Sequence, residues 1–480
     1  MPATTLTASA AQIAAATPED RDRYLDLLRA IAIATVVVGH WLVAMVWVSD
    51  GALRAAAVID VAPATRWLTW IVQVMPLFFL VGGVVNVRSW RTTRDAGGSY
   101  ATWLARRAAR LLRPTTVVVW TWLFLAPLAT AAGVDRNLVV LGARSALVPL
   151  WFLGVYLLVI ALVPVLLEAW RRLGLWLPAA LVVAAAAIDA TVRGAIPLLG
   201  LVNYLVVWSV PTVLGFAWAD GRLERRAIRI GLPLAALAGL VVAVTWLGYP
   251  ISMVGLAEQD AGGPNVPRVT LALLGCVQTG AALAMRARAT TWLRRRGPWA
   301  AVVRANSVAM TVYLWHLTVL VLVTAALSLT GSWWSVTPLT GAWWLTRPLW
   351  LVGLALVLAP VVVALLPIER DAPVPRPRGG GPAATLGMVA AAAATSGAVA
   401  ALTLGDVLGP AALPGGVVLT LAAVHTGAFR APRPTGRLRR RRPTRRDVPT
   451  HGVTNAALCA CKPECRSGHT RSVSRDAPNA

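Results

Sequence analysis

Three side chains stand out for their chemistry within one apolar segment near the start of the chain, RYLDLLRAIAIATVVVGHWL. They are Asp26, Arg29 and His40. In a helix, the eleven steps from Arg29 to His40 return to nearly the same azimuth and cover roughly 16 Å along the axis. Asp26 precedes Arg29 by three residues and can pair with it. One helix face therefore carries an ion pair near one end and an imidazole, which can act as a general acid or base, toward the other.

Two interpretations of this face remain open. Polar groups in a membrane-spanning segment are costly, so each of the three is a candidate functional residue. Alternatively, Asp26 and Arg29 form an interfacial ion pair and His40 packs as a satisfied polar residue. A second histidine, His316, lies in the apolar segment SVAMTVYLWHLTVLVL. An interhelical hydrogen bond is the commoner role of such a residue, and a part in catalysis is the alternative.

A run of arginines forms a further candidate site in WLARRAARLLRP. Arg106, Arg110 and Arg113 share one face if this run is helical. Guanidinium groups bind phosphate oxygens through paired hydrogen bonds, so the stripe predicts a phosphate-binding mouth. The same arginines would serve equally as a signal of membrane topology.

The elements that must position these residues are membrane helices. Of the 480 residues, 57% are hydrophobic and only 14% are charged, and the mean hydropathy is +0.66. These values lie outside the range of soluble domains. The net charge of +25 does not indicate nucleic acid as a partner, because the arginines cluster between apolar runs and in the C-terminal tail.

Apolar runs long enough to cross about 30 Å of hydrocarbon define the expected spans. The ten core runs are 24–47, 67–87, 114–132, 147–167, 175–190, 201–219, 231–247, 269–285, 305–328 and 348–367. Two further runs, 385–405 and 411–428, follow a Pro/Arg-rich stretch and are expected to form an additional pair. The fold class is thus an all-α, polytopic helix bundle with about ten core transmembrane helices and a C-terminal pair.

The arginines also predict the orientation of the bundle. The alternate loops 88–113, 168–174, 220–230, 286–304 and 368–384 carry 22 arginines, whereas the intervening loops carry 7. Because positive residues favour the cytoplasmic side, the N-terminus is expected in the cytoplasm. The expected divisions are a cytoplasmic segment 1–20, a core 21–367, a linker 368–384, a helix pair 385–428 and a disordered basic tail 429–480 that can meet anionic membrane lipids.

The tail also holds a cluster of potential metal ligands. Cys459, Cys461, Cys465 and His469 have the spacing C-x-C-x₃-C-x₃-H. This spacing lacks the paired C-x₂-C of zinc sites, and the surrounding segment has little apolar content on which to build a domain. The sequence therefore predicts no metal site.

Several motifs of the chain resemble one family in type and order. They are the R-x₁₀-H pair of Arg29 and His40, MPLFFLVGGVVN (75–86), RRAARLLRP (106–114), PLWFLGVYLLV (149–159) and NSVAMTVYLWH (306–316). Together they resemble the acyltransferase-3 family of integral membrane acyltransferases, over about residues 20–367. The resemblance implies a ten-helix core in the plasma membrane. It also implies transfer of an acyl group, often acetyl, from cytoplasmic acyl-CoA to a hydroxyl of a surface glycan, lipid or exported metabolite.

The resemblance implies roles for individual residues. His40 would be the catalytic histidine, Arg29 its partner on the donor side, and Arg110 and Arg113 part of the family's basic loop. With the spacing above, it suggests that CoA phosphates bind at the arginines, with Asp26 and Arg106 beside them. The thioester would then reach His40, as a general base or a covalent acyl carrier. His316 is expected to orient a substrate or stabilise charge. Acyl-CoA is a substrate here, and no tightly bound cofactor is expected.

The chain departs from the family's motifs at two positions. Many relatives have serine where this chain has Gly82, and relatives acting on O-antigen often have Glu shortly after the residue matching Trp151. These differences put the role of that serine and the identity of the acceptor in question. A transporter or lipid flippase would also be polytopic, but it would tend to show internal repeats, and the chain has no convincing repeat.

Overall fold

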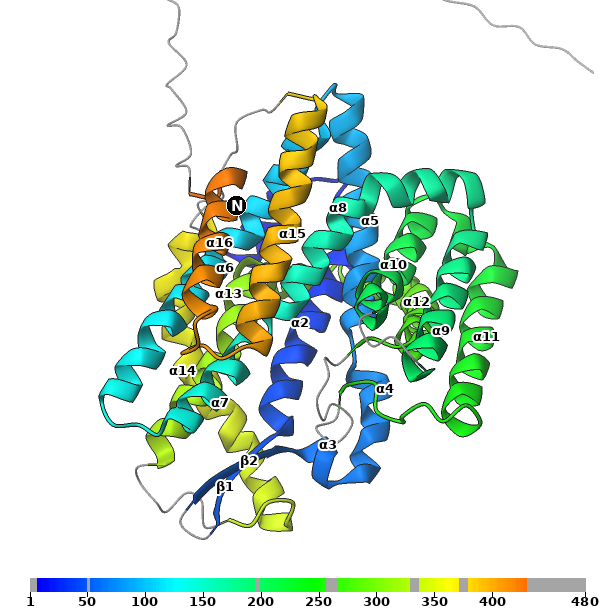
Figure 1. The fold of residues 1–480 in the computed structure, drawn as a ribbon. Helices are drawn as coiled ribbons and strands as arrows, with labels where there is room; N and C mark the ends of the chain where they lie inside the picture. Colours follow the sequence, from blue (N-terminus) through cyan, green and yellow to red (C-terminus); the bar gives the residue numbers. More distant parts are fainter. Residues whose placement is uncertain are drawn as a thin grey trace, which may run out of the picture. The chain divides into compact units, whose positions relative to one another are not determined.

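The computed structural model describes residues 7–49, 52–194, 199–255, 266–328, 336–370 and 379–429, and most of their regular structure is helical. Strands β1 (Ala44–Ser49) and β2 (Ala52–Ala57) form an antiparallel hairpin. The helices in Figure 1 are α1 (Ala10–Ala15), α2 (Arg23–Val43), α3 (Val58–Val61), α4 (Thr69–Val72), α5 (Met75–Asp95), α6 (Tyr100–Ala131), α7 (Arg136–Leu147), α8 (Leu150–Leu173), α9 (Trp176–Gly194), α10 (Gly200–Ala219), α11 (Arg226–Thr245), α12 (Val269–Trp292), α13 (Arg296–Ser328), α14 (Gly341–Arg370), α15 (Pro382–Leu404) and α16 (Ala412–Thr426).

Each apolar run expected to be a helix contains one, although the first run ends in a strand and the run 67–87 is divided between α4 and α5. Among the described residues, ten helical segments are long and apolar enough to cross a membrane. These ten include α15, whereas α16 and the described part of α9, Trp176–Thr191, are shorter apolar helices. The prediction of an all-α, multi-pass membrane protein is confirmed.

The first spanning helix is shorter than predicted. We expected it to continue to residue 47, but α2 ends at Val43 and the chain enters β1. Hydropathy cannot place this boundary, because the apolar residues of β1 suit a packed strand as well as a helix. Met45 is buried in a cluster with Val58 and Trp343, so tertiary packing decides the conformation here.

The arginine run is helical rather than part of a loop. We expected residues 88–113 to be a loop, but α5 extends to Asp95 and α6 begins at Tyr100. The Ser99 side chain accepts a hydrogen bond from the Thr102 amide at 3.2 Å and so caps α6. A hydropathy window ends a span where arginines begin, although arginine is a good helix former. The predicted loop was therefore too long at both ends.

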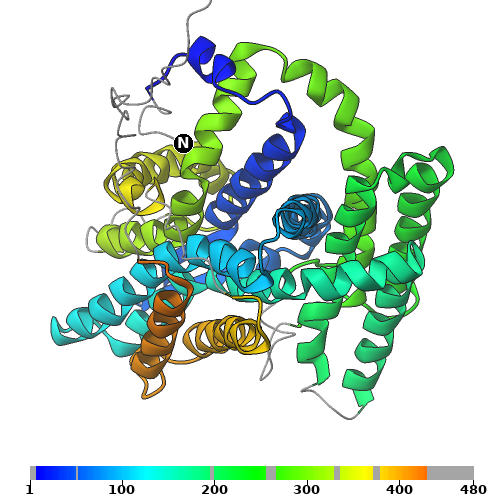
Figure 2. The ribbon, with the colours of Figure 1, turned by 90° about the horizontal axis from the view of Figure 1, so that it is seen from above.

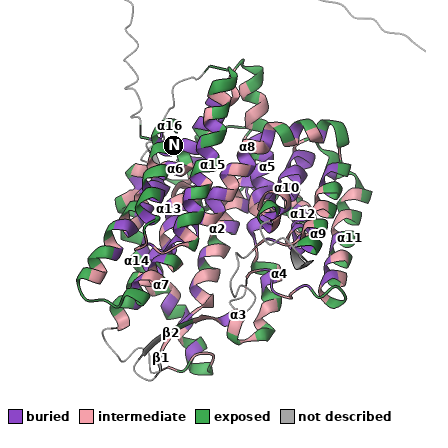
Figure 3. Cartoon of the chain, viewed as in Figure 1, coloured by how far each residue is buried: buried purple, intermediate pink, exposed green. Residues whose placement is uncertain are grey.

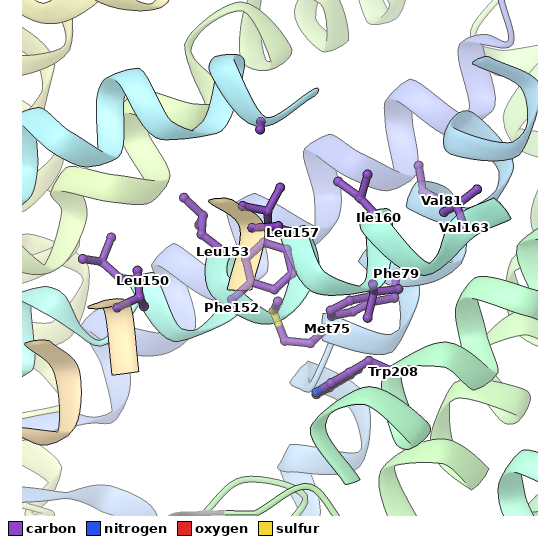
Figure 4. Packing of buried hydrophobic residues seen from close by; sticks show 14 of the residues in the cluster. Met75, Phe79, Val81, Leu150, Phe152, Leu153, Leu157, Ile160, Val163 and Trp208 are labelled. Carbon is purple, nitrogen blue, oxygen red and sulfur yellow. The ribbon is translucent and has the colours of Figure 1, made fainter. Parts of the chain in front are cut away.

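Helix α5 lies at the centre of the packing around the site. It contacts α2, α6, α8, α10 and α12, and Figure 2 shows it nearly end-on among its neighbours. Gly83 and Gly215 allow α5 and α10 to approach closely, since a Cβ at either position would collide with backbone of the other helix. Figure 4 shows Phe79 of α5 beside Trp208 of α10, and their rings stack at a centroid distance of 4.7 Å. These contacts hold α5 in a fixed position beside the site.

The C-terminal helix pair packs on the side chains and backbone of α6 and α8. Helix α15 contacts α8, and α16 contacts α6. The Ser396 hydroxyl donates to the Gly154 carbonyl at 2.8 Å, and the Trp120 indole donates to the Thr420 hydroxyl at 2.8 Å. The predicted tail from residue 430, and residues 371–378 of the predicted linker, lie outside the described residues.

Burial follows the pattern of a membrane protein. Figure 3 shows buried residues within the bundle and exposed residues on its outer faces. Many large apolar side chains are exposed there, including Phe124, Val183 and Leu356. An apolar surface of this extent is unfavourable in water and suits a hydrocarbon environment.

Candidate active site

Helices α2 and α13 pack side by side and run in the same direction, and polar side chains connect them near both ends. Arg29 donates from Nε to Oδ1 of Asn306 at 2.7 Å. Eleven residues further along α2, Nδ1 of His40 lies 2.8 Å from Nε2 of His316. Asn306 and His316 are ten residues apart, so the spacing on the two helices matches. We call the first contact the arginine end and the second the histidine end.

The two histidines form an edge-to-edge hydrogen bond. Their ring planes are inclined by only 2° and their centroids are 5.1 Å apart, while the two nitrogens approach to 2.8 Å. Rings stacked face to face at that centroid distance would not bring two nitrogens so close. His316 is completely buried and His40 is half-buried. The structure thus brings together the two histidines that the sequence singled out on separate segments.

A third contact determines which ring nitrogens carry hydrogen. Nδ1 of His316 lies 2.7 Å from the carbonyl oxygen of Tyr313, which can only accept. Nδ1 of neutral His316 therefore carries the hydrogen, and its Nε2 accepts from Nδ1 of His40. It follows that Nε2 of His40 keeps a free lone pair and can take a proton.

Tryptophans hold the backbone around the histidine end. The Trp41 indole donates to the carbonyl of His316 at 3.0 Å, and the Trp350 indole donates to the carbonyl of Trp41 at 3.2 Å. Both tryptophans are buried in an apolar cluster between α2, α13 and α14. Because these bonds connect three helices next to the histidines, they restrict movement of the pair.

The arginine end is an ionic network. The Asp26 carboxylate lies 2.7 Å from Nε of Arg21 and 3.5 Å from Nη2 of Arg29. Asn306 donates from Nδ2 to the carbonyls of Asp26 and Val302, at 2.8 and 3.1 Å. Both amide hydrogens are thereby used, so the amide oxygen faces Arg29. Asn306 and Asp26 together hold the guanidinium of Arg29 in place.

A cavity of about 250 Å³ begins at the arginine end and lies between α2, α5, α6, α8 and α13. Its charged and amide-bearing lining consists of Arg29, Arg107, Arg110 and Asn306. Most of the remaining lining is apolar, namely Ala32, Ile33, Val36, Met75, Phe78, Val81, Val85, Leu111, Phe152, Leu153, Ile160, Ala309 and Met310, with Gly82, Tyr156 and Tyr313. Val36 and Tyr313 are each about one helical turn from the histidine pair, which itself does not line the cavity.

The structure separates the residues expected to bind the donor into two groups. Arg29 and Arg110 line the cavity, whereas Arg106, Arg113 and Asp26 do not. Arg107, which does not belong to the predicted stripe of Arg106, Arg110 and Arg113, lines the cavity instead. Asp26 acts on Arg29 through the ion pair described above. The binding roles of all these residues stay predictions.

The adjacent glycines of α5 have different surroundings. Gly83 faces α10 and allows close helix packing, whereas Gly82 faces the cavity. A Cβ at Gly82 would lie 2.9 Å from both Cε2 and the hydroxyl oxygen of Tyr156. The tyrosine thus takes the space that a serine at position 82 would need.

Aromatic rings line the end of the cavity that lies nearer the two histidines. The Phe152 ring packs edge-on against Phe78 and Tyr313, with centroid distances of 5.0 and 5.7 Å. It also lies parallel to the Tyr156 ring at 5.4 Å. Such contacts stabilise a fixed geometry.

Three residues of the site escaped the sequence analysis. Asn306 begins the segment that ends at His316, and its spacing from that histidine was the available signal. Arg107 lies one residue from the predicted stripe, so only the true rotation of α6 reveals it. Nothing in the sequence indicates that Tyr156 faces Gly82, because that contact depends on the packing of α5 against α8.

The described residues contain no group of three or more His, Cys, Asp or Glu side chains that could hold a metal ion. The cysteines and histidine of the tail, Cys459, Cys461, Cys465 and His469, lie outside the described residues.

Fold and site together define a multi-pass membrane protein with a basic cavity that leads toward a histidine pair inside the spanning helices. Residues 22–366 match the family model Acyl_transf_3, described as an acyltransferase domain. The chain therefore belongs to the acyltransferase-3 family and is a membrane acyltransferase, as the resemblance of its motifs predicted. No curated protein and no solved structure matches the chain.

Proposed function

We propose that this membrane acyltransferase moves an acetyl group from cytoplasmic acyl-CoA to a hydroxyl of a surface glycan, lipid or exported metabolite, and that it does so in the plasma membrane. The observation that carries the proposal is the cavity, with three arginines at one end and the histidine pair about one helical turn beyond the other. Such a cavity suits a long donor with phosphates at one end and an acyl thioester at the other.

The arginines supply the binding site for the phosphates of the donor. Arg29, Arg107 and Arg110 converge on the cavity from α2 and α6. Arg107 and Arg110 form no ion pair with any described residue, so their charge is available to an anion. Guanidinium groups bind phosphate oxygens bidentately and keep their charge at any physiological pH.

The length of the site matches the length of the donor. Arg29 and His40 are separated by eleven residues of α2, which corresponds to roughly 16 Å along the helix. The pantetheine arm of CoA has a comparable length. A donor held at the arginines thus extends its thioester toward His40.

The hydrogen-bond pattern of the histidines suits general-base catalysis. Nε2 of His40 takes the proton of the acceptor hydroxyl while the hydroxyl oxygen attacks the acyl carbon. The new C–O bond forms, the C–S bond breaks, and His40 returns the proton to the departing thiolate. His316 accepts from Nδ1 of His40 throughout and stabilises the imidazolium that forms in between.

Comparative mass spectrometry of surface glycans, lipids and exported metabolites tests the proposal. We expect one product to carry an additional acetyl group in cells with the wild-type protein. That product should be absent without the gene and in cells with His40→Ala at equal membrane expression. His425→Ala, which changes a histidine of α16 outside the cavity, is the matched control and should retain the product. An acetylated product that persists with His40→Ala contradicts the proposal.

A further inference from the structure

Tyr156 of α8 contributes a hydroxyl to the mostly apolar lining of the cavity. Tyr313, the other tyrosine of the lining, uses its hydroxyl hydrogen in a 2.9 Å bond to the carbonyl of Pro149. The Tyr156 oxygen accepts a hydrogen bond from Nδ2 of Asn86 at 3.3 Å. Since that bond uses only a lone pair, the hydroxyl hydrogen of Tyr156 remains to be donated.

The surroundings of Tyr156 hold its ring in one place. Gly82 leaves room for it on α5, since a Cβ there would come within 2.9 Å of the ring and the hydroxyl. Phe78 and Phe79 contact the ring edge-on, each at a centroid distance of 5.6 Å. The hydroxyl is therefore positioned before any ligand arrives, which lowers the entropic cost of a hydrogen bond to a ligand.

The depth of Tyr156 indicates which part of a donor it meets. Phe152 contacts Tyr313, and Tyr313 precedes His316 by about one turn of α13. Tyr156 lies about one further turn along α8, away from the histidine end. Two turns amount to about 10 Å, well within the roughly 16 Å between Arg29 and His40. At that depth, the part of a bound acyl-CoA beside Tyr156 is the middle of the pantetheine arm rather than the thioester.

We propose that the Tyr156 hydroxyl donates a hydrogen bond to an amide carbonyl oxygen in the arm of the acyl donor. This inference rests on the proposed function, because it needs a donor that extends from the arginines to His40. In a mostly apolar cavity, a buried amide without a partner would weaken binding. Tyr156 supplies that partner and so favours thioesters with an amide-bearing arm over simple ones.

Steady-state kinetics of Tyr156→Phe tests this role in the full-length protein in nanodiscs. The variant keeps the ring and removes only the hydroxyl, so we expect KM for acetyl-CoA to rise about 5- to 10-fold while kcat stays similar. Tyr100→Phe is the matched control, because the Tyr100 hydroxyl bonds to the Ala161 carbonyl at 2.8 Å and does not line the cavity. Its KM should equal that of the wild type.

A second donor separates recognition of the amide from a structural effect. With the acetyl thioester of a simple alkyl thiol, which has no amide, Tyr156→Phe and the wild type should have equal kcat/KM. An equal loss with both donors would show a structural role and overturn the inference, as would an unchanged KM for acetyl-CoA. In that last case the wild type still transfers acetyl and the proposed function stands. A wild-type protein that transfers no acetyl from acetyl-CoA overturns both.

Discussion

The arginine end and the histidine end of the α2–α13 pair differ in burial and in charge, although the same two helices form both. At the arginine end, Asp26 is shared by two arginines and the Arg29 side chain is 38% exposed. At the histidine end, the two hydrogen-bonded rings have no charged partner among the described residues, and His316 is completely buried. Exposed ion pairs are weak and can be exchanged for a ligand, whereas buried hydrogen bonds hold their geometry. The difference suits binding at one end and proton transfer at the other.

Removing His40, the proposed general base, should have the largest effect on kcat. We expect His40→Ala to lower kcat at least about 1,000-fold, since general-base catalysis contributes about 10²- to 10⁴-fold. The measurement is acetyl transfer by purified protein at equal amounts of folded enzyme. A kcat within a few-fold of the wild type would show that His40 does not act in acyl transfer.

Removing His316, the hydrogen-bond partner of His40, should have the next largest effect on kcat. In His316→Leu the hydrogen of His40 Nδ1 loses its buried acceptor, so we expect kcat to fall about 100-fold. His316→Gln should recover part of this loss, because the Gln side-chain oxygen can accept that hydrogen. The two variants are compared by kcat at saturating donor. Equal activity of Leu and Gln at this position would show that the hydrogen bond to His40 is not what matters.

A change at the arginine end should alter binding instead. We expect Arg29→Ala to raise KM for acetyl-CoA about 10-fold with little change in kcat, because it removes one charged contact to the donor. Arg171→Ala is the control, since Arg171 pairs with Glu168 on α8 outside the cavity. A fall in kcat without a change in KM would erase the distinction between the two ends.

The ion pair of Arg91 and Asp220, neither of which lines the cavity, should affect only stability. Burial raises the pKa of Asp220, but hydrogen bonds from Arg91 and Trp170 outweigh it and lower the pKa overall. A lowered pKa in the folded state means that this stabilisation is present above the unfolded value of about 4 and is lost as pH falls through the folded value.

Asp220→Asn should therefore cost about 1 kcal/mol at neutral pH. Its melting temperature should also depend less on pH below about pH 4 than that of the wild type. Thermal unfolding in detergent across that pH range checks this, and acetyl transfer at neutral pH should be unchanged. A variant as stable as the wild type at neutral pH would show that the pair contributes nothing.

The sequence predicted the histidine end and the arginine end to different degrees. His40 and His316 stand out because a histidine in an apolar helix is rare and costly, although only the packing of α2 on α13 shows that they touch. Arg107 replaced Arg106 in the cavity because the rotation of a helix about its axis depends on tertiary contacts. The hairpin after Val43 was missed because apolar residues do not reveal by hydropathy whether they form helix or strand.

The most direct test of the division between the two ends is the dissociation constant of acetyl-CoA from His40→Ala, measured by isothermal titration calorimetry in nanodiscs. We predict that this variant binds acetyl-CoA as tightly as the wild type although it does not transfer the acetyl group. Loss of binding in His40→Ala would contradict the account, because it would place His40 in the donor site rather than at the chemical step.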